Sequence, residues 1–122
     1  MPNYIDGFVF PLLESQLNEY KPLAEAVATI WKEHGALDYV EYLGDDLSLD
    51  GTRSFIDAID AKKGEVIIFG WVVFESRQSR DLVNEKVEND VRMADLINSF
   101  DSGFDAKRMA HGGFKPFISK AD

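Results

Sequence analysis

The sequence predicts an α+β protein in which an antiparallel sheet carries its helices on one face. Apolar patterns along the 122 residues follow the order strand, helix, strand, strand, helix, strand, which is the split βαβ or ferredoxin-like plan. The length suits one domain over residues 1–122 with one core. A strand near the middle is apolar on both sides, so a second copy of the chain is expected to cover the face that the helices leave open.

The central strand is EVIIFGWVVFES, residues 65–76. Alternate residues of a strand point to opposite faces. One parity holds Val66, Ile68, Val72 and Phe74, and the other holds Ile67, Phe69, Trp71 and Val73. Neither face suits water, and the chain has helices enough to cover only one of them. We therefore expect a homodimer that forms through the sheet face.

The first half of the chain begins with a strand over residues 3–12, where Pro11 ends the pairing or marks an edge. Residues 15–34 show the spacing of an amphipathic helix, with Ser15 as its cap and Gly35 as its stop. Pro22 predicts either a kink or a later start near Lys21. A second strand follows over residues 36–43.

The acidic stretch 44–53 predicts a loop, followed by a short helix that Ser54 caps and that ends before Gly64. After the central strand, Ser79 is expected to cap one long helix over residues 80–99. Its predicted buried side is formed by Leu82, Val83, Val87, Val91, Ala94 and Ile97. A last segment, residues 109–118, has β character that two glycines and Pro116 limit.

Composition narrows the function classes. The chain has no cysteine, and its formal net charge is -9, so disulfides and thiolate chemistry are excluded. A phosphate backbone is bound by clustered Lys and Arg, and the sequence shows no such cluster; we expect no nucleic-acid partner. The N-terminal residues lack the basic start of a secretory signal, and no apolar run approaches about 20 residues. We expect a cytoplasmic protein that does not enter membranes.

The stretch 46–57 places oxygen side chains at the spacing of a calcium loop, with Gly51 at the turn position. Arg53 stands where an apolar residue is usual, Asp57 is shorter than the usual bidentate Glu, and a strand precedes the loop. An acidic connector with a capped helix explains the same residues. We expect neither tight calcium binding nor another metal site, and no cofactor.

Three residues are candidate catalytic or ligand-binding groups: Glu41, Asp6 and His111. Glu41 alternates with Leu37, Tyr39 and Leu43, which predicts that it faces the interior. A carboxylate in apolar surroundings holds a proton more readily than one in water, so Glu41 or Asp6 can carry protons. Tyrosine hydroxyls, Arg108 and His111 are the partners that the sequence offers for a buried Glu41. A structural carboxylate at the dimer interface is the alternative interpretation.

His111 lies in a strand just before Gly112 and Gly113. It is a candidate general base, although an exposed or hydrogen-bonded strand histidine is the commoner case. The glycine pair precedes a strand residue rather than a helix, so a bulge or a close backbone approach explains it better than a phosphate loop. His34, the other histidine, falls at a helix C-terminus, where a structural role is expected.

Several segments together resemble the bacterial YbaA-like proteins, a domain-of-unknown-function family (number 1428). The segments are YIDGFVFP at 4–11, WKEHGALDYVEYLGDD at 31–46, RD at 80–81 and FDAKRMAHGGF at 104–114. The resemblance implies a ferredoxin-like protomer of the dimeric α/β-barrel type, in which two sheets pack face to face. The sequence departs from the family pattern at Val91, where proline is usual, and at His111, where tyrosine is usual.

The resemblance supplies no activity. Proteins of similar architecture include cofactor-independent monooxygenases and isomerase-like enzymes that hold a small ligand between sheet and helices. This implies a binder of a small, partly apolar molecule, or an enzyme acting on one, with Trp71 as a candidate pocket wall. The alternative is a non-catalytic dimeric binding or stress-related module.

Overall fold

The computed structural model describes residues 3–99 and 103–120. Four antiparallel strands form one sheet in the order β2-β3-β1-β4, which is the ferredoxin-like arrangement that the sequence predicts. The elements are β1 (Tyr4–Leu13), the 3₁₀ helix η1 (Glu14–Gln16), α1 (Leu17–Glu33), β2 (Asp38–Leu43), α2 (Phe55–Ala58), β3 (Glu65–Phe74), α3 (Arg77–Glu88), α4 (Val91–Ser99), the 3₁₀ helix η2 (Ala106–Arg108) and β4 (Ala110–Phe114).

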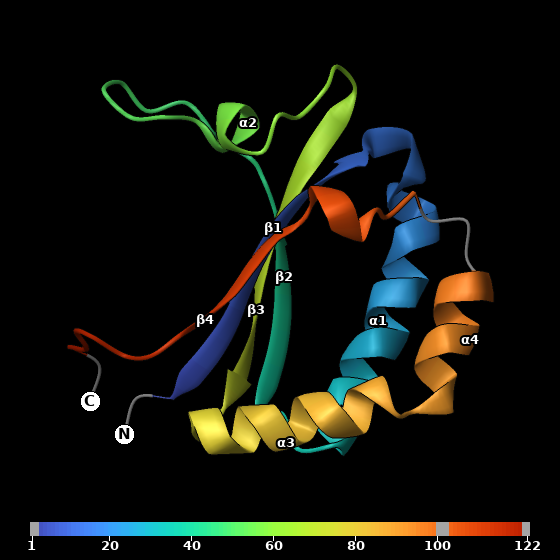
Figure 1. The fold of residues 1–122 in the computed structure, drawn as a ribbon. Helices are drawn as coiled ribbons and strands as arrows, with labels where there is room; N and C mark the ends of the chain where they lie inside the picture. The colour runs from blue at the N-terminus through green and yellow to red at the C-terminus, as the bar shows by residue number, and fades with distance from the viewer. Residues whose placement is uncertain (1–2, 100–102, 121–122) are drawn as a thin grey trace.

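The helices α1, α3 and α4 cover one face of this sheet. In Figure 1, α1 and α4 stand side by side next to the strands, and α3 runs across one end of the sheet. The core lies between these two layers. Its buried members are Phe8, Phe10, Leu12, Tyr20, Leu23, Ile30, Ala36, Ile68, Val72, Phe74, Val83 and Val87.

The central strand β3 has the two apolar faces that its parity predicts. Ile68, Val72 and Phe74 are buried beneath the helices. On the other face Phe69 is 39% exposed and Trp71 is half-buried. The side chains on the helix-covered face of β3 therefore belong to the protomer core. The aromatic side chains Phe69 and Trp71 on its other face are in contact with solvent.

We call this second surface the open face. The rings of Tyr42 and Trp71 stack with centroids 5.3 Å apart, and Phe69 meets Trp71 edge-on at 6.1 Å. The short helix α2 covers only one end of the face, where Phe55 contacts Phe69 at 5.5 Å. Trp71 therefore cannot be a wall of a pocket between sheet and helices, which corrects the expectation from the sequence.

The predicted helix over residues 80–99 is wrong in two respects. It is divided into α3 and α4, and its first cap is Ser76, which accepts a 3.0 Å hydrogen bond from the Ser79 amide. Asp90 caps the second piece by accepting from the Arg92 amide at 2.9 Å. Part of the predicted buried side is solvent-exposed: Leu82 (56%) in α3, and Val91 (78%), Ala94 and Ile97 (56%) in α4.

The first half of the chain shows smaller corrections. α1 begins at Leu17 instead of Ser15, and Pro22 lies inside the helix on its exposed side. Gly35 has a φ of 121°, as expected for the residue that ends a helix. Pro11 does not end β1, whose pairing with β3 continues to Leu13; it lies beyond the last β1–β4 pair, at an edge position.

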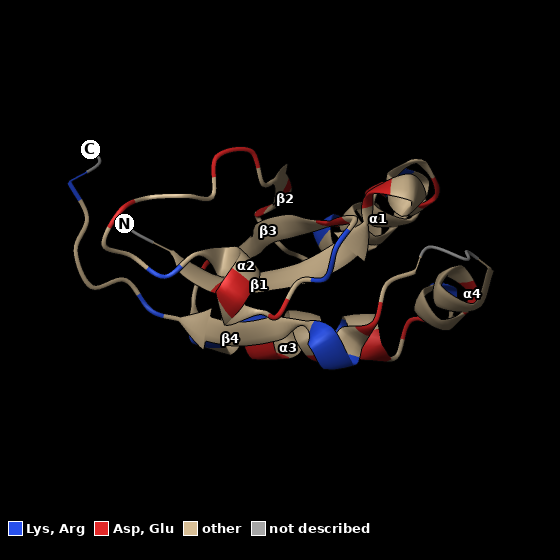
Figure 2. Ribbon diagram, turned by 90° about the horizontal axis from the view of Figure 1, so that it is seen from above, with Lys and Arg blue, Asp and Glu red and all other residues tan. Residues whose placement is uncertain are grey.

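Charged residues are distributed over most elements. Figure 2 shows acidic residues on the loop after β2, and single basic residues on α3 and near the C-terminal segment, with no basic stripe along one element in this view. Within the described residues, no helix combines the length and the apolar character that crossing a bilayer requires.

Candidate functional site

A cavity of about 230 Å³ lies between the helix-covered face of the sheet and helices α1 and α4. We call it the interlayer pocket. Apolar and aromatic side chains form most of its wall, and a few polar groups join them. The lining residues are Asp6, Phe8, Phe10, Tyr20, Leu23, Ala24, Val27, Trp31, Tyr39, Glu41, Val72, Met93, Ile97, Phe104, Met109 and His111. All three candidates from the sequence, Asp6, Glu41 and His111, are therefore at one cavity.

Glu41 points toward the helices, as the sequence predicts, and is half-buried. Its Oε1 accepts a 2.5 Å hydrogen bond from the Tyr20 hydroxyl of α1, and its Oε2 accepts a 2.8 Å bond from the Tyr39 hydroxyl of β2. Leu37 and Leu43 share the parity of Glu41 but are 48% and 52% exposed. Tyr39 alone among the three apolar neighbours shares the inward environment of Glu41.

The two tyrosines keep their protons. Burial raises the pKa of both phenols, and the adjacent Glu41 charge raises it further. Each hydroxyl therefore remains a donor to the carboxylate over the whole physiological range. An ionised carboxylate has about four acceptor positions, so two positions on Glu41 are left for a ligand.

Asp6 is 2% exposed and forms an ion pair with Arg80, whose Nε lies 3.2 Å from Oδ1. The geometry is that of an ion pair without a hydrogen bond. Arg80 also donates to the Tyr4 hydroxyl at 2.9 Å. Gly113 pairs with Asp6 across β4 and β1, and a Cβ at Gly113 would collide with Tyr4 and Arg80. The glycine thus makes room for the arginine that neutralises Asp6.

His111 occupies β4 opposite Phe8, and its residue is exposed. The register places Glu41, Gly70, Phe8 and His111 in one row across the sheet. Adjacent strands are about 4.8 Å apart, so the backbones of Glu41 and His111 are separated by about 14 Å. The two side chains therefore face the pocket from opposite edges of the sheet.

Gly70 makes this row possible. A Cβ at Gly70 would lie 2.5 Å from the Val40 carbonyl oxygen and 2.7 Å from Cζ of Phe8. The ring of Phe8 thus lies over a position without a side chain. The Phe8 ring lines the interlayer pocket between Glu41 and His111.

Other polar residues that the sequence singled out lie elsewhere. Arg108 is not a partner of Glu41, because it binds both oxygens of Glu65, at 2.5 and 2.9 Å. His34 lies at the C-terminus of α1, as predicted, and is 2.7 Å from Asp90. The Gly112–Gly113 pair forms no bulge, since β1 and β4 stay in register from Ile5↔Phe114 to Val9↔Ala110.

Sequence reasoning missed Arg80, and it named no particular tyrosine as the partner of Glu41. Arg80 stands in the RD segment at 80–81 and Tyr4 in the first segment of the family resemblance, so the motifs did contain the signal. Strand parity does not say which helix residue lies above which strand residue. The contact between Tyr20 and Glu41 is therefore visible only in the structure.

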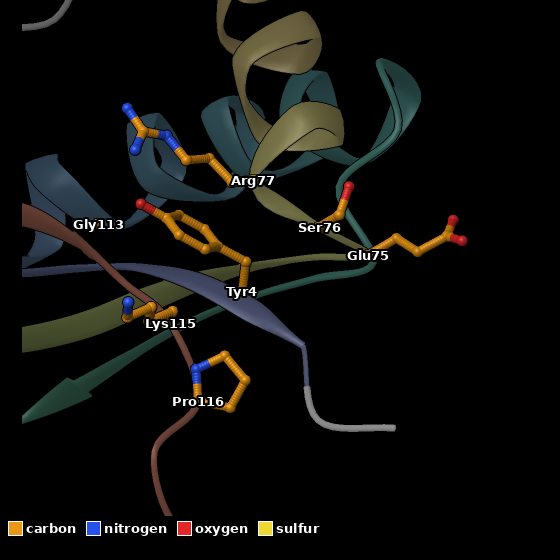
Figure 3. Close-up of a pocket in the computed structure, with 7 residues that line it drawn as sticks. All are labelled: Tyr4, Glu75, Ser76, Arg77, Gly113, Lys115 and Pro116. Carbon is orange, nitrogen blue, oxygen red and sulfur yellow. The ribbon is translucent and has the colours of Figure 1, made fainter.

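Two further cavities flank these residues. One of about 510 Å³ lies between α1 and β2 and shares Tyr20, Ala24, Tyr39 and Glu41 with the interlayer pocket, so these side chains border both spaces. We call it the outer cavity. The other, of about 490 Å³, lies at the start of α3, where Figure 3 shows the Tyr4 ring between Arg77 and Lys115. Its lining is exposed except for Tyr4, so we do not treat it as the candidate site.

Among the residues that the structure describes, no group of three or more His, Asp or Glu side chains is close enough together to hold a metal ion. In the acidic stretch, Ser54 accepts from the Ile56 amide at 3.1 Å and caps α2, as predicted. Asp57 lies in the first turn of that helix. The weak calcium affinity predicted for this loop stays a prediction.

Comparison with known proteins gives the fold and the family. The structure is similar to a NIPSNAP-family protein of unknown function from Agrobacterium tumefaciens, with a TM-score of 0.57, 14% identity, and coverage of 94% of this chain and 88% of the other. The At3g17210 protein from Arabidopsis thaliana gives a TM-score of 0.53 at 11% identity, over 97% and 99% of the two chains. These likenesses concern the fold alone.

The chain shares a higher sequence identity with curated proteins than with these two structures. The chain is 34% identical over 117 residues to the uncharacterised protein YbaA of Escherichia coli K12, which covers 96% of this chain and 98% of YbaA. The YbaA of Shigella flexneri matches equally well. The family model described as "Protein of unknown function (DUF1428)" matches residues 3–106. The chain therefore belongs to the DUF1428 family.

Proposed function

We propose that this protein binds a small, largely apolar molecule in the interlayer pocket and moves a proton on it through Glu41 and His111. The observation that carries the proposal is the convergence of Asp6, Glu41 and His111 on one cavity that is otherwise apolar and aromatic. Pockets of this composition, with few polar groups, are typical of small-molecule sites. Ionisable groups within them are candidates for acid–base chemistry.

The geometry supports separate roles for the three residues. Asp6 pairs with Arg80 and takes no part in the proton transfer, because its carboxylate is fully buried beside a cation. Glu41 has acceptor positions free and can take a proton from a bound molecule. His111 approaches from the opposite edge and can return a proton to a different atom. Such a transfer is an isomerisation, which requires no external electrons.

The same proposal includes a homodimer in which two open faces pack together as an α/β barrel. The support is the aromatic surface of Tyr42, Phe69 and Trp71, together with Phe114, which is 59% exposed. Burying these rings between two copies would give an interface of roughly 2,000 Å². Light scattering should give twice the chain mass of 13.8 kDa; a stable monomer at micromolar concentration would contradict the dimer.

A non-catalytic dimeric binding module is the second candidate. The observation in its favour is that each oxygen of Glu41 already accepts a hydrogen bond from a tyrosine, as expected of a carboxylate that ties α1 to β2. In this alternative Glu41 stabilises the fold and has no role in proton transfer. A cytoplasmic location belongs to both candidates and is testable by cell fractionation.

Native mass spectrometry of the purified protein separates the two. We expect the wild type to retain a bound small molecule and Glu41→Gln to lose it, while the fold and the dimer are maintained. Glu75→Gln is the matched control: it removes one carboxylate at an exposed position outside the interlayer pocket and should retain the ligand. Intact retention with a lower melting temperature in Glu41→Gln would favour the binding module.

A further inference from the structure

We propose that the ligand of the interlayer pocket is a small organic cation, an ammonium group carried on an apolar body. The inference rests on the proposed function, because it specifies the charge of the molecule that this pocket binds. Two independent features of the pocket carry it: an uncompensated carboxylate and a wall of aromatic rings.

The carboxylate is Glu41. Among the ion pairs of residues 3–99 and 103–120, none includes Glu41, and its hydrogen-bond partners are two neutral phenols. Lys21 lines the outer cavity next to Glu41 but forms no ion pair with it. The buried Asp6, by contrast, has Arg80 beside it. The protein therefore supplies a cation for one carboxylate of the pocket and leaves the other for a ligand.

The second feature is the aromatic wall. Six rings line the cavity: Phe8, Phe10, Tyr20, Trp31, Tyr39 and Phe104. Several of them form a continuous series, with centroid distances of 6.1 Å from Tyr39 to Phe8, 6.3 Å from Phe8 to Phe10, and 5.6 Å from Phe10 to Tyr20.

Aromatic faces carry negative electrostatic potential and attract cations within about 6 Å. Groups of aromatic rings recognise ammonium ligands in proteins, and a carboxylate beside them adds an opposite charge. The aromatic part also accommodates an apolar body, so both ends of an alkyl- or arylammonium ion find complementary surfaces.

Size and overall charge agree with this class of ligand. The cavity of about 230 Å³ is below the roughly 300–1,000 Å³ of sites for drug-sized molecules. A net charge of -9 attracts cations toward the protein and repels anions. An anionic ligand would meet the Glu41 charge directly, and a neutral one would leave that charge without a positive counter-charge.

Three matched probes test the proposal at neutral pH: 2-phenylethylammonium, the equally sized neutral 2-phenylethanol, and the anion phenylacetate. Calorimetry should show the cation binding about tenfold or more tightly than the alcohol, with the anion weakest. In Glu41→Gln this preference should disappear, whereas Glu75→Gln, which changes the net charge equally, should preserve it. The comparison within the wild type decides the question even where Glu41→Gln fails to fold.

The results distinguish this inference from the proposed function. Equal affinity for cation and alcohol, or tighter binding of the anion, would overturn the cation and leave a small-molecule pocket in place. A cation preference that persists in folded Glu41→Gln would also overturn it, because the charge would then act elsewhere. Absence of binding by all three probes would count against both proposals.

Discussion

The Tyr20 hydroxyl of α1 donates a 2.5 Å hydrogen bond to Glu41 of β2, so a helix and an edge strand meet at a carboxylate that lines the interlayer pocket. This bond closes the pocket on the side of the outer cavity. Its loss should affect both the stability of the fold and the binding of a ligand.

Tyr20→Phe removes only the hydroxyl and leaves Glu41 with one tyrosine partner. We expect the free energy of unfolding to fall by about 1–2 kcal/mol, since a hydrogen bond to a charged group is lost at a partly buried site. Urea denaturation measures this change. Tyr42→Phe is the control: it removes a hydroxyl of the open face but keeps the ring that the proposed dimer would bury, and it should leave stability within about 0.5 kcal/mol.

Arg80 should be essential to the fold because it neutralises Asp6. Arg80→Met leaves a carboxylate that is 2% exposed without a cation, which costs about 3 kcal/mol or more. The double variant Asp6→Asn/Arg80→Met should recover much of this loss. Arg77→Met removes an exposed arginine of the same helix, 3.9 Å from Asp81, and should cost less than about 0.5 kcal/mol. Equal losses for Arg80 and Arg77 would contradict the role given to the ion pair.

Two adjacent glycines offer a matched pair of substitutions. A methyl group at Gly113 would collide with the Tyr4 hydroxyl and with Arg80, whereas one at Gly112 would lie 3.7 Å from the Phe114 ring. Gly113→Ala should therefore displace Arg80 and destabilise the protein by about 1–3 kcal/mol, while Gly112→Ala should change stability by less than about 0.5 kcal/mol. Thermal unfolding of both variants checks the difference.

Acid should destabilise the junction between α3 and α4. Hydrogen bonds from Arg92 and His34 hold the pKa of Asp90 well below its ordinary value. A depressed carboxylate pKa stabilises the fold at neutral pH, and that contribution is lost as pH falls below about 4, the ordinary Asp value. Asp90→Asn should lower stability at neutral pH and flatten this part of the pH profile. Asp95→Asn, at an exposed position of α4, should leave the slope unchanged.

The sheet was predictable because period-2 alternation fixes which strand residues share a face. That rule predicted that Glu41 faces the interior before any helix position was known, and it left open whether Glu41 and His111 share one pocket. It did not locate Tyr20 or Arg80, because contacts between a helix and a sheet depend on the rotation and translation of the helix. Arg80 neutralises Asp6, whereas Tyr20 gives Glu41 a neutral hydrogen-bond donor.

The break between α3 and α4 shows why one helix was predicted instead of two. Apolar residues keep a helical spacing through residues 89–91, so periodicity contains no stop signal there. The local signal was polar: Asp90 accepts from the Arg92 amide, which is the hydrogen bond of a helix cap. Val91 is the first residue of α4, a position that proline favours.

The interlayer pocket itself is tested most directly by locating a bound probe. Whichever of 2-phenylethylammonium and 2-phenylethanol binds more tightly should show intermolecular nuclear Overhauser effects to the ring protons of Tyr20, Tyr39 and Phe8. Contacts to the rings of Tyr42 and Trp71 instead would place the ligand on the open face and contradict the account.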